Sequence, residues 1–392
     1  MGADEVHNIY GHYWNKMLFD NYKKELPNER LFHLNRSGFA GSQRYSIFPW
    51  SGDVSRSWSG LQAQVPLMLG MSMSGIPYIH ADAGGFAGGE GDNELYVRWL
   101  QFAAFTPIFR PHGTALFEKD TAAYSFPSEP ALIDTPWKEY AKQAVQLRYS
   151  MLPYNYTLAY KQTSKGEPLV APLYYHYPKD MAAANVNDEF MWGECILVAP
   201  VLEKGLKERN VYLPEGKWYS FYEDDTNIYN GNALINFPLS LSRIPVFVKE
   251  GSFIPEHRNR ENNENTSTYK AVNISVHYFP SKKISSGFIY NDDGVAKNSK
   301  PEIITFTGVA KNGKLIYDIK TNDKAYYVKG KKRFLTIGSS IAIESEKIHH
   351  SDNTQILGID VLTDKRRGKE NTFYSIILEF AGTPVHIEVD TK

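Results

Sequence analysis

The sequence predicts an α/β part over residues 1–180, followed by all-β regions to the end of the 392-residue chain. Before residue 180, short β-like runs alternate with helical segments, which is typical of parallel βα units. After residue 180, short segments of alternating apolar and polar residues are bounded by Gly, Pro, Asn and Asp, as in antiparallel sheets. A hydrophobic content of 42% is sufficient for packed cores.

The α/β part is expected to begin with an amphipathic helix at residues 4–25, which Pro27 ends. Further helices are predicted at residues 57–69, 94–105 and 136–165. Between them lie β-like runs, which we place near residues 31–36, 74–81, 107–112 and 168–175, with the run at 31–34 expected to be buried. Catalytic groups of parallel barrels follow the carboxyl ends of the strands. Arg36, Asp82 and His112 fall at such ends, which favours a barrel-type site.

The β part is expected to form two antiparallel sandwich domains, at residues 181–258 and 259–392. The polar segment 257–268, HRNRENNENTST, has the composition of a linker or exposed loop. Each β domain is expected to bury its own core.

Composition and motifs exclude several function classes. A net charge of -1 gives no reason to expect nucleic acid or an anionic membrane as partner, and no apolar run approaches the ~20 residues of a membrane span. The single cysteine, Cys195, excludes an intrachain disulfide and a multi-cysteine metal site. The histidines show no metal-ligand spacing, and GGFAGG lacks the spacing of a phosphate-binding loop, so we expect no metal and no other cofactor.

The stretch from Asn35 to Asp53 has the residue types of a sugar site. Trp50 offers an aromatic face, Arg36 a donor for hydroxyls, and Asp53 an acid after a flexible Ser-Gly turn. From these residues alone, a loop in which Asp53 caps the next helix and Trp50 is a core residue fits equally well.

Four blocks carry a family resemblance. They are RSGFAGSQRY, PWSGDVSRSWSGLQ, GIPYIHADAGGFAGG and ELYVRWLQFAAFTPIFRPH, and in this order they resemble the second half of the catalytic domain of glycoside hydrolase family 31. The resemblance continues to about residue 255 through FMWGECILVAPVLEKG and IPVFVKEGSFIP. It implies that the α/β part is the C-terminal half of a (β/α)8 TIM-type barrel.

The same resemblance implies roles for site residues. Asp53 would be the general acid/base, Arg36 and His112 would bind sugar hydroxyls, and Trp50 and Phe86 would form the apolar walls of the pocket. Asp82 resembles a site carboxylate of the family. Each residue also has a structural alternative. Asp53 could be a helix cap and Arg36 a partner in a structural ion pair. Trp50, Phe86 and His112 could be core residues, and Asp82 could be a turn acceptor.

The resemblance also implies a retaining reaction on α-linked glucose oligosaccharides. A retaining enzyme needs a nucleophilic carboxylate beside its acid/base, and the family places it in a WxDxxE-like segment before the helix at 4–25. We expect this sequence to be a C-terminal portion that is inactive alone and that pairs with an N-terminal half or with itself. An α-1,4-transglucosidase or an α-xylosidase fits the same blocks, and a non-catalytic carbohydrate-binding remnant is the competing hypothesis from another class.

Overall fold

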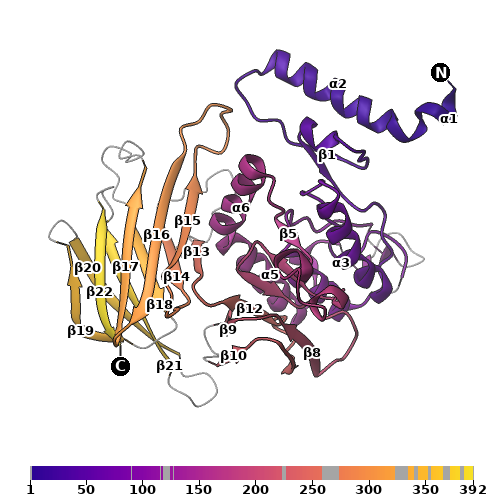
Figure 1. Ribbon diagram of the computed structural model, residues 1–392. Helices are drawn as coiled ribbons and strands as arrows, with labels where there is room; N and C mark the ends of the chain where they lie inside the picture. The colour runs from indigo at the N-terminus through magenta and orange to yellow at the C-terminus, as the bar shows by residue number, and fades with distance from the viewer. Residues whose placement is uncertain are drawn as a thin grey trace.

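The computed structural model describes residues 2–89, 91–114, 116–117, 124–126, 128–222, 227–257, 273–322, 334–339, 343–351, 355–364, 371–379 and 384–391. We name three parts of the chain: the barrel part (2–165), the proximal part (166–252) and the distal part (253–391). The proximal part lies between the other two along the chain, and the distal part packs beside helix α6 (Figure 1). No helix among the described residues is long and apolar enough to cross a membrane.

The barrel part contains most of the helices. They are α1 (Ala3–Val6), η1 (His7–Ile9), α2 (Tyr10–Glu25), η2 (Ser42–Tyr45), α3 (Trp58–Met73), α4 (Asn93–Ala103), η3 (Pro130–Leu132), α5 (Trp137–Ser150) and α6 (Leu152–Lys165). The predicted helices at 4–25, 57–69 and 94–105 are confirmed within a few residues. The helix predicted at 136–165 is wrong in one respect, because it breaks at Met151 into α5 and α6. Pro153 lies in the first turn of α6, where its missing N–H costs no hydrogen bond.

Short parallel pairings order the barrel part. Strand β1 (His33–Asn35) pairs in parallel with β2 (Ile47–Pro49), a strand that the sequence analysis missed. Single parallel bridges then join Trp50 to His80 and Ala83 to Pro111. These pairings put the ends of four successive segments at one edge, as in a βα barrel. A separate antiparallel pair, β3 (Leu116–Phe117) and β4 (Tyr124–Phe126), follows them.

Two predictions for the barrel part are corrected. The run at 31–34 is not buried: Phe32 is 60% exposed and Leu34 40% exposed, because β1 has β2 as its single neighbour among the described strands. The run at 168–175 is not a barrel strand. It forms β5 (Val170–Ala171), which pairs antiparallel with β6 (Phe190–Trp192), and the short helix α7 (Leu173–His176).

The proximal part is a six-stranded sheet in the order β10-β9-β12-β7-β6-β5, beside the separate pair β8 and β11. Its remaining elements are η4 (Ala183–Asn185), β7 (Ile196–Val198), β8 (Glu208–Leu213), β9 (Lys217–Ser220), β10 (Ile228–Asn230), β11 (Ala233–Pro238) and β12 (Val246–Lys249). The pairings are antiparallel, as the alternating pattern predicted. The domain boundaries at 180 and 258 stay predictions.

The distal part consists of two five-stranded sheets, β13-β14-β18-β21-β20 and β15-β16-β17-β22-β19. Their strands are β13 (Phe253–His257), β14 (Asn273–Tyr278), β15 (Ser285–Asn291), β16 (Glu302–Lys311), β17 (Lys314–Thr321), β18 (Phe334–Ser339), β19 (Ile343–His350), β20 (Gln355–Asp364), β21 (Asn371–Glu379) and β22 (Val385–Thr391). The sheets are not purely antiparallel, because β14 pairs in parallel with β18. Of the predicted linker at 257–268, residues 258–268 lie outside the described residues.

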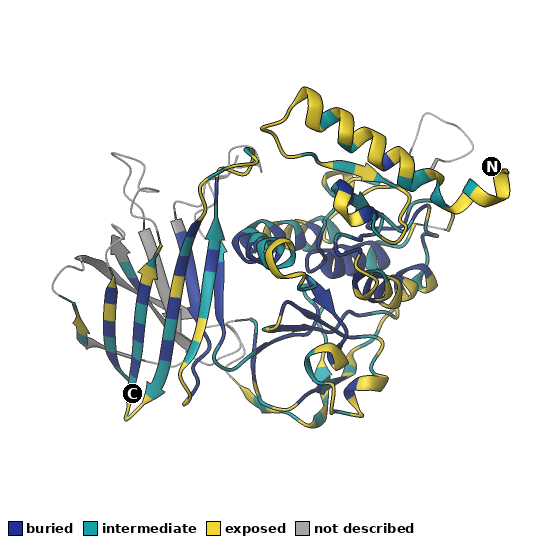
Figure 2. Ribbon diagram, turned by 45° about the horizontal axis from the view of Figure 1, so that its top comes forward, coloured by how far each residue is buried: buried dark blue, intermediate teal, exposed yellow. Residues whose placement is uncertain are grey.

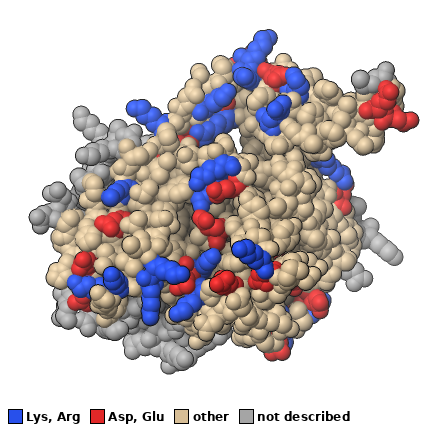
Figure 3. Space-filling view, viewed as in Figure 1, with Lys and Arg blue, Asp and Glu red and all other residues tan. Residues whose placement is uncertain are grey.

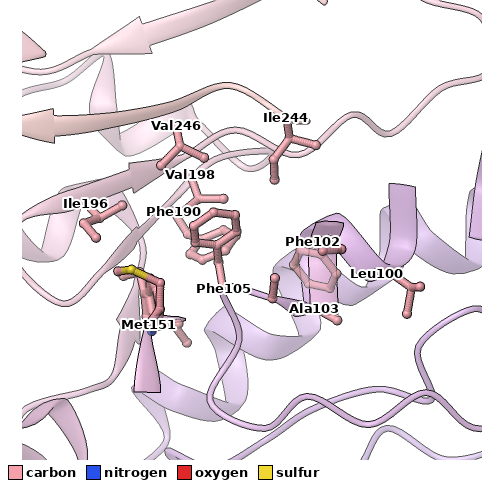
Figure 4. Close-up of a cluster of buried hydrophobic side chains, with 14 of the residues drawn as sticks. Leu100, Phe102, Ala103, Phe105, Met151, Phe190, Ile196, Val198, Ile244 and Val246 are labelled. Atoms are coloured by element: carbon pink, nitrogen blue, oxygen red, sulfur yellow. The ribbon is translucent and has the colours of Figure 1, made fainter. Parts of the chain in front are cut away.

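One hydrophobic core joins the barrel part to the proximal sheet. At the end of α4, Phe102 meets Phe190 of β6 edge to face, and Phe105 meets Trp192 in the same way (Figure 4). Trp99 of α4 is fully buried in this cluster. Each such buried aromatic contributes about 1.5–3 kcal/mol. The proximal part also buries a core of its own, which includes Trp218 and Phe247, and the distal part has a separate core, as expected from the sequence.

Candidate active site

The six side chains predicted for a sugar site meet at one edge of the parallel segments. Arg36 follows β1, and Trp50 and Asp53 follow β2. Asp82 follows the bridge at His80, and His112 follows the bridge at Pro111. We call this group the site cluster; its members are Arg36, Trp50, Asp53, Asp82, Phe86 and His112, with Arg110 and His80 added by the contacts described below.

Arg36 and Asp53 form an ion pair at the mouth of the cluster. Nη1 of Arg36 lies 3.2 Å from Oδ1 of Asp53, and both side chains are about half exposed. Gly52 permits this approach: its φ is +88°, and a Cβ there would lie 2.7 Å from Nη2 of Arg36. An exposed ion pair of this kind contributes little to stability, about 0–1 kcal/mol.

Asp53 does not cap the next helix. The side chain of Ser57 accepts the hydrogen bond from Gly60 N–H at the start of α3, so Ser57 is the N-cap. This contact removes the structural alternative for Asp53 that the sequence left open.

Asp82 lies in the floor of the cluster and is fully buried. Arg110 Nη2 donates to its Oδ1, while Oδ2 has no hydrogen-bond partner in the described structure. Burial raises the pKa of Asp82, and the charges of Arg110 and His112 act against that rise. Asp53 is close enough to repel it electrostatically. The alternative of a turn acceptor is wrong for this side chain, because its partner is an arginine.

Arg110 connects the floor of the cluster to its wall. Its Nε donates to Nε2 of His80 at 3.1 Å, and its guanidinium carbon lies 5.4 Å from the ring centre of Trp50. His80 is buried, and this burial together with the Arg110 charge lowers its pKa to about 4, so it stays a neutral acceptor at pH 7. The sequence analysis did not assign Arg110 to the site.

His112 and Phe86 lie next to each other in the site cluster. Their ring centres are 5.6 Å apart, and His112 is exposed, so the alternative of a core histidine is wrong. Phe86 and Trp50 are partly exposed and are not core residues of the described clusters. The cluster thus contains two aromatic rings, two arginines, two histidines and two carboxylates.

Arg56 holds the glycine-rich loop that carries Phe86. It is buried, and its guanidinium donates to the carbonyls of Gly88, Phe86 and Thr114. A Cβ at Gly85 would lie 2.5 Å from the Arg56 Cα, which explains a glycine there. The sequence analysis missed Arg56, because an arginine upstream of GGFAGG gives no signal that its side chain contacts the backbone of that loop.

Arg148 of α5 fixes the segment before Arg110. It is buried and donates to the carbonyls of Thr106 at 2.6 Å and Pro107 at 2.7 Å. Burial lowers its pKa to about 10, which still leaves the guanidinium charged at pH 7. Among the described residues there is no group of three or more His, Cys, Asp or Glu side chains placed to hold a metal ion.

Comparison with known proteins agrees with this geometry. The family model "Glycosyl hydrolases family 31 TIM-barrel domain" matches residues 1–158, and "Glycosyl hydrolase family 31 C-terminal domain" matches residues 166–254. The chain belongs to glycoside hydrolase family 31. The family 31 resemblance predicted from sequence is therefore confirmed, and so is a TIM-barrel domain followed by antiparallel sheets in coarse outline.

The family 31 chain resembles both glucosidases and xylosidases. It is 37% identical to an α-glucosidase of Saccharolobus solfataricus over 64% of this chain and 35% of the relative. It is 34% identical to an α-xylosidase of the same organism, over 74% and 38%. The structure of a GH31 dextranase of Flavobacterium johnsoniae complexed with glucose matches 99% of this chain and 49% of its own, with a TM-score of 0.86 and 27% identity. The chain spans little more than a third of the length of these curated relatives.

Proposed function

We propose that this chain supplies the acid/base side of a retaining glycosidase that acts on α-linked glucose oligosaccharides. The observation that carries the proposal is the placement of Asp53. Its carboxylate stands half exposed, 3.2 Å from the Arg36 guanidinium and close enough to the buried Asp82 to act on its pKa. Asp82 pairs with Arg110, which lies against the ring of Trp50. This arrangement offers a sugar an apolar face, charged hydrogen-bond partners and one solvent-accessible acid.

In the proposed reaction, Asp53 acts twice. Its proton passes to the departing glycosidic oxygen while a separate carboxylate attacks the anomeric carbon. The resulting aspartate then takes a proton from water, and the water oxygen displaces the enzyme carboxylate. Arg36, 3.2 Å away, would bind a sugar hydroxyl next to Asp53.

We propose that the nucleophile comes from residues outside this chain. The retaining geometry requires two carboxyl groups about 5–5.5 Å apart. The second carboxylate of the cluster, Asp82, is buried and engaged by Arg110, so a supporting role suits it better than attack. Its charge would hold Arg110 and His112 in place for the sugar.

A partner bearing the nucleophile would bind at the amino-terminal surface. Helix α2 is exposed along most of its length (Figure 2), and its exposed fractions reach 61% at Tyr10 and 51% at Trp14. Phe32 and Leu34 of β1 add exposed apolar surface beside it. Exposed apolar patches and unpaired strand edges favour association, here with the remaining strands of a barrel.

The substrate class rests on the relatives. One relative is an α-glucosidase, and two similar structures are of a dextranase in complex with glucose and with isomaltotriose. An α-xyloside substrate is the second candidate, because an α-xylosidase is 34% identical to this chain. Product analysis of the assembled enzyme on maltooligosaccharides, isomaltotriose and α-xylosides separates these substrates, and added acceptor sugars separate hydrolysis from transglycosylation.

The acid/base role is tested with Asp53→Asn in the assembled enzyme. Natural disaccharides need protonation of the leaving oxygen, so their turnover should fall by about 10²–10⁴-fold. Aryl glycosides with activated leaving groups should keep most of their glycosylation rate. Asp4→Asn, an exposed aspartate outside the cluster, serves as the matched control. Equal loss on both substrate classes would assign Asp53 another function.

A further inference from the structure

A polar groove lies where the three parts of the molecule meet. Two adjoining hollows of about 390 and 240 Å³ share the side chains of Leu158, Lys161, His176 and Glu194. The larger hollow extends between β12 and β15, and neither contains a residue of the site cluster. We call it the junction groove. Charged side chains of both signs gather along the same seam, in the middle of the face that Figure 3 shows.

The charges in the junction groove balance. Lys161 Nζ lies 2.6 Å from Oε1 of Glu194, so this pair presents donors and acceptors together. Lys249 and Glu250 contribute one further charge of each sign to the larger hollow. Glu167 of the smaller hollow is offset by Lys165, whose Nζ lies 3.7 Å from its Oε1. Burial lowers the pKa of His176, which is therefore neutral at pH 7. Balanced charge gives no net attraction for an anion or a cation, so the groove suits a neutral ligand with many hydroxyls.

Aromatic rings border both hollows. Phe288 of β15 lines the larger one beneath Lys161, whose Nζ lies 5.4 Å from its ring centre. Tyr175 of α7 lines the smaller one and is 42% exposed. Flat apolar faces next to fixed polar groups are how proteins bind the two kinds of surface on a pyranose. The volume of the larger hollow also lies in the range of ligand pockets, about 300–1,000 Å³.

Covalent chemistry in the groove is disfavoured. Cys195 lines the larger hollow, but burial raises its pKa to about 11, so the thiol is not a nucleophile at pH 7. The groove is accordingly suited to binding alone.

We propose that the junction groove is a second oligosaccharide-binding site, separate from the site cluster. The groove's own chemistry specifies a neutral oligosaccharide, and the choice of an α-linked glucose chain rests on the proposed function. Because α6, the β6–β7 turn and β15 each contribute a side chain, a bound chain would contact all three parts at once. Ligand binding would therefore stabilise the packing of the distal part on the other two parts.

The test measures binding rather than activity. Isothermal titration calorimetry of the 392-residue chain with maltoheptaose and with isomaltotriose is repeated on an Arg36→Ala/Asp53→Asn variant, which lacks the key groups of the site cluster. We expect binding to persist in that variant and to weaken by about tenfold or more, ~1.4 kcal/mol, when Tyr175→Ala is added. Tyr174→Ala is the matched control: Tyr174 is 43% exposed but lines neither hollow, and its replacement should change affinity less than about twofold.

A second variant guards against misfolding. Ser286→Trp removes no described contact of the groove lining and would fill the larger hollow, so it should abolish binding while circular dichroism stays unchanged. Absence of binding in the Arg36→Ala/Asp53→Asn variant would overturn the second site without touching the proposed function, which Asp53→Asn kinetics test independently. Equal losses with Tyr174→Ala and Tyr175→Ala, or displacement of the sugar by inorganic phosphate, would also overturn it.

Discussion

Replacing Arg110 with Met would leave the fully buried Asp82 without its described partner. Asp82 Oδ1 receives the Arg110 Nη2 hydrogen bond, and Oδ2 already has no partner. Removing one member of a buried ion pair costs about 3–5 kcal/mol, because the other charge stays desolvated. His80 loses its Arg110 donor as well, although a neutral imidazole that loses one hydrogen bond adds only about 1 kcal/mol.

The loss of stability in Arg110→Met should depend on pH. Burial already raises the pKa of Asp82, and removing the Arg110 charge raises it further. The folded state then holds the Asp82 proton to a higher pH than the unfolded chain, whose aspartate titrates near about 3.9. Stability of Arg110→Met relative to wild type should therefore be nearly normal below about pH 4 and fall as the pH rises through the folded pKa.

The assay is chemical denaturation, followed by tryptophan fluorescence, across this pH range. Hydrogen exchange at Ala83, whose N–H donates to the Arg110 carbonyl, reports the local opening. The Asp82→Asn/Arg110→Met variant should recover much of the loss, since no charge is then buried. Arg44→Met, at an exposed arginine, is the control. A loss that is the same at low and neutral pH would refute the buried-charge explanation.

Gly52→Ala should push Arg36 away from Asp53 and strain a backbone at φ +88°, so the activation barrier that kcat/KM reports for the assembled enzyme should rise by about 1–3 kcal/mol. Gly70→Ala is the control, because a Cβ there meets open space and kcat/KM should not change. Burial raises the pKa of Glu189 to about 8, so the stability that this group contributes to the folded protein is lost between about pH 4.5 and 8. In thermal melts, Glu189→Gln should therefore raise the stability of the protein at pH 8 and not at pH 4.5. An effect that does not depend on pH would contradict this explanation. The 392-residue chain alone should show no glycosidase activity, and a separately expressed nucleophile-bearing half should restore some; robust activity without it would place the nucleophile in this chain.

The sequence analysis selected side chains that the structure brings together, but it missed one of the strands that carry them. Arg36, Asp82 and His112 were identifiable as candidates because each sits in a block of matching residues and follows an expected strand end, whereas Asp53 was identifiable from its block alone. Strand β2 was missed because Ile47–Pro49 is too short to show alternation and itself ends on a proline. The break between α5 and α6 was missed because Pro153 is compatible with a first helical turn, so apolar periodicity continues across it.

Contacts between distant segments had no sequence signal. Arg110 lies two residues before His112, and nothing local shows that its guanidinium turns back to Asp82 and His80. Likewise, Arg56 contacts Gly88 and Thr114 through backbone carbonyls, whose position depends on the fold and not on residue type. Side chain to backbone contacts of this kind are invisible to pattern analysis, although they fix the loops that present the predicted residues.

The shared core makes the proximal part a structural component of the site. Phe102 and Phe105 at the end of α4 pack on β6, and the chain then runs directly into the segment that carries Arg110 and His112. Arg148 holds the carbonyls of that segment from the other side. The segment between α4 and His112 is thus anchored by a sheet that belongs to the next part of the chain. Because a displacement of about 1 Å can cost a hundredfold in rate, we expect substitutions that loosen this shared core to lower the activity of the assembled enzyme, even though they lie outside the site cluster.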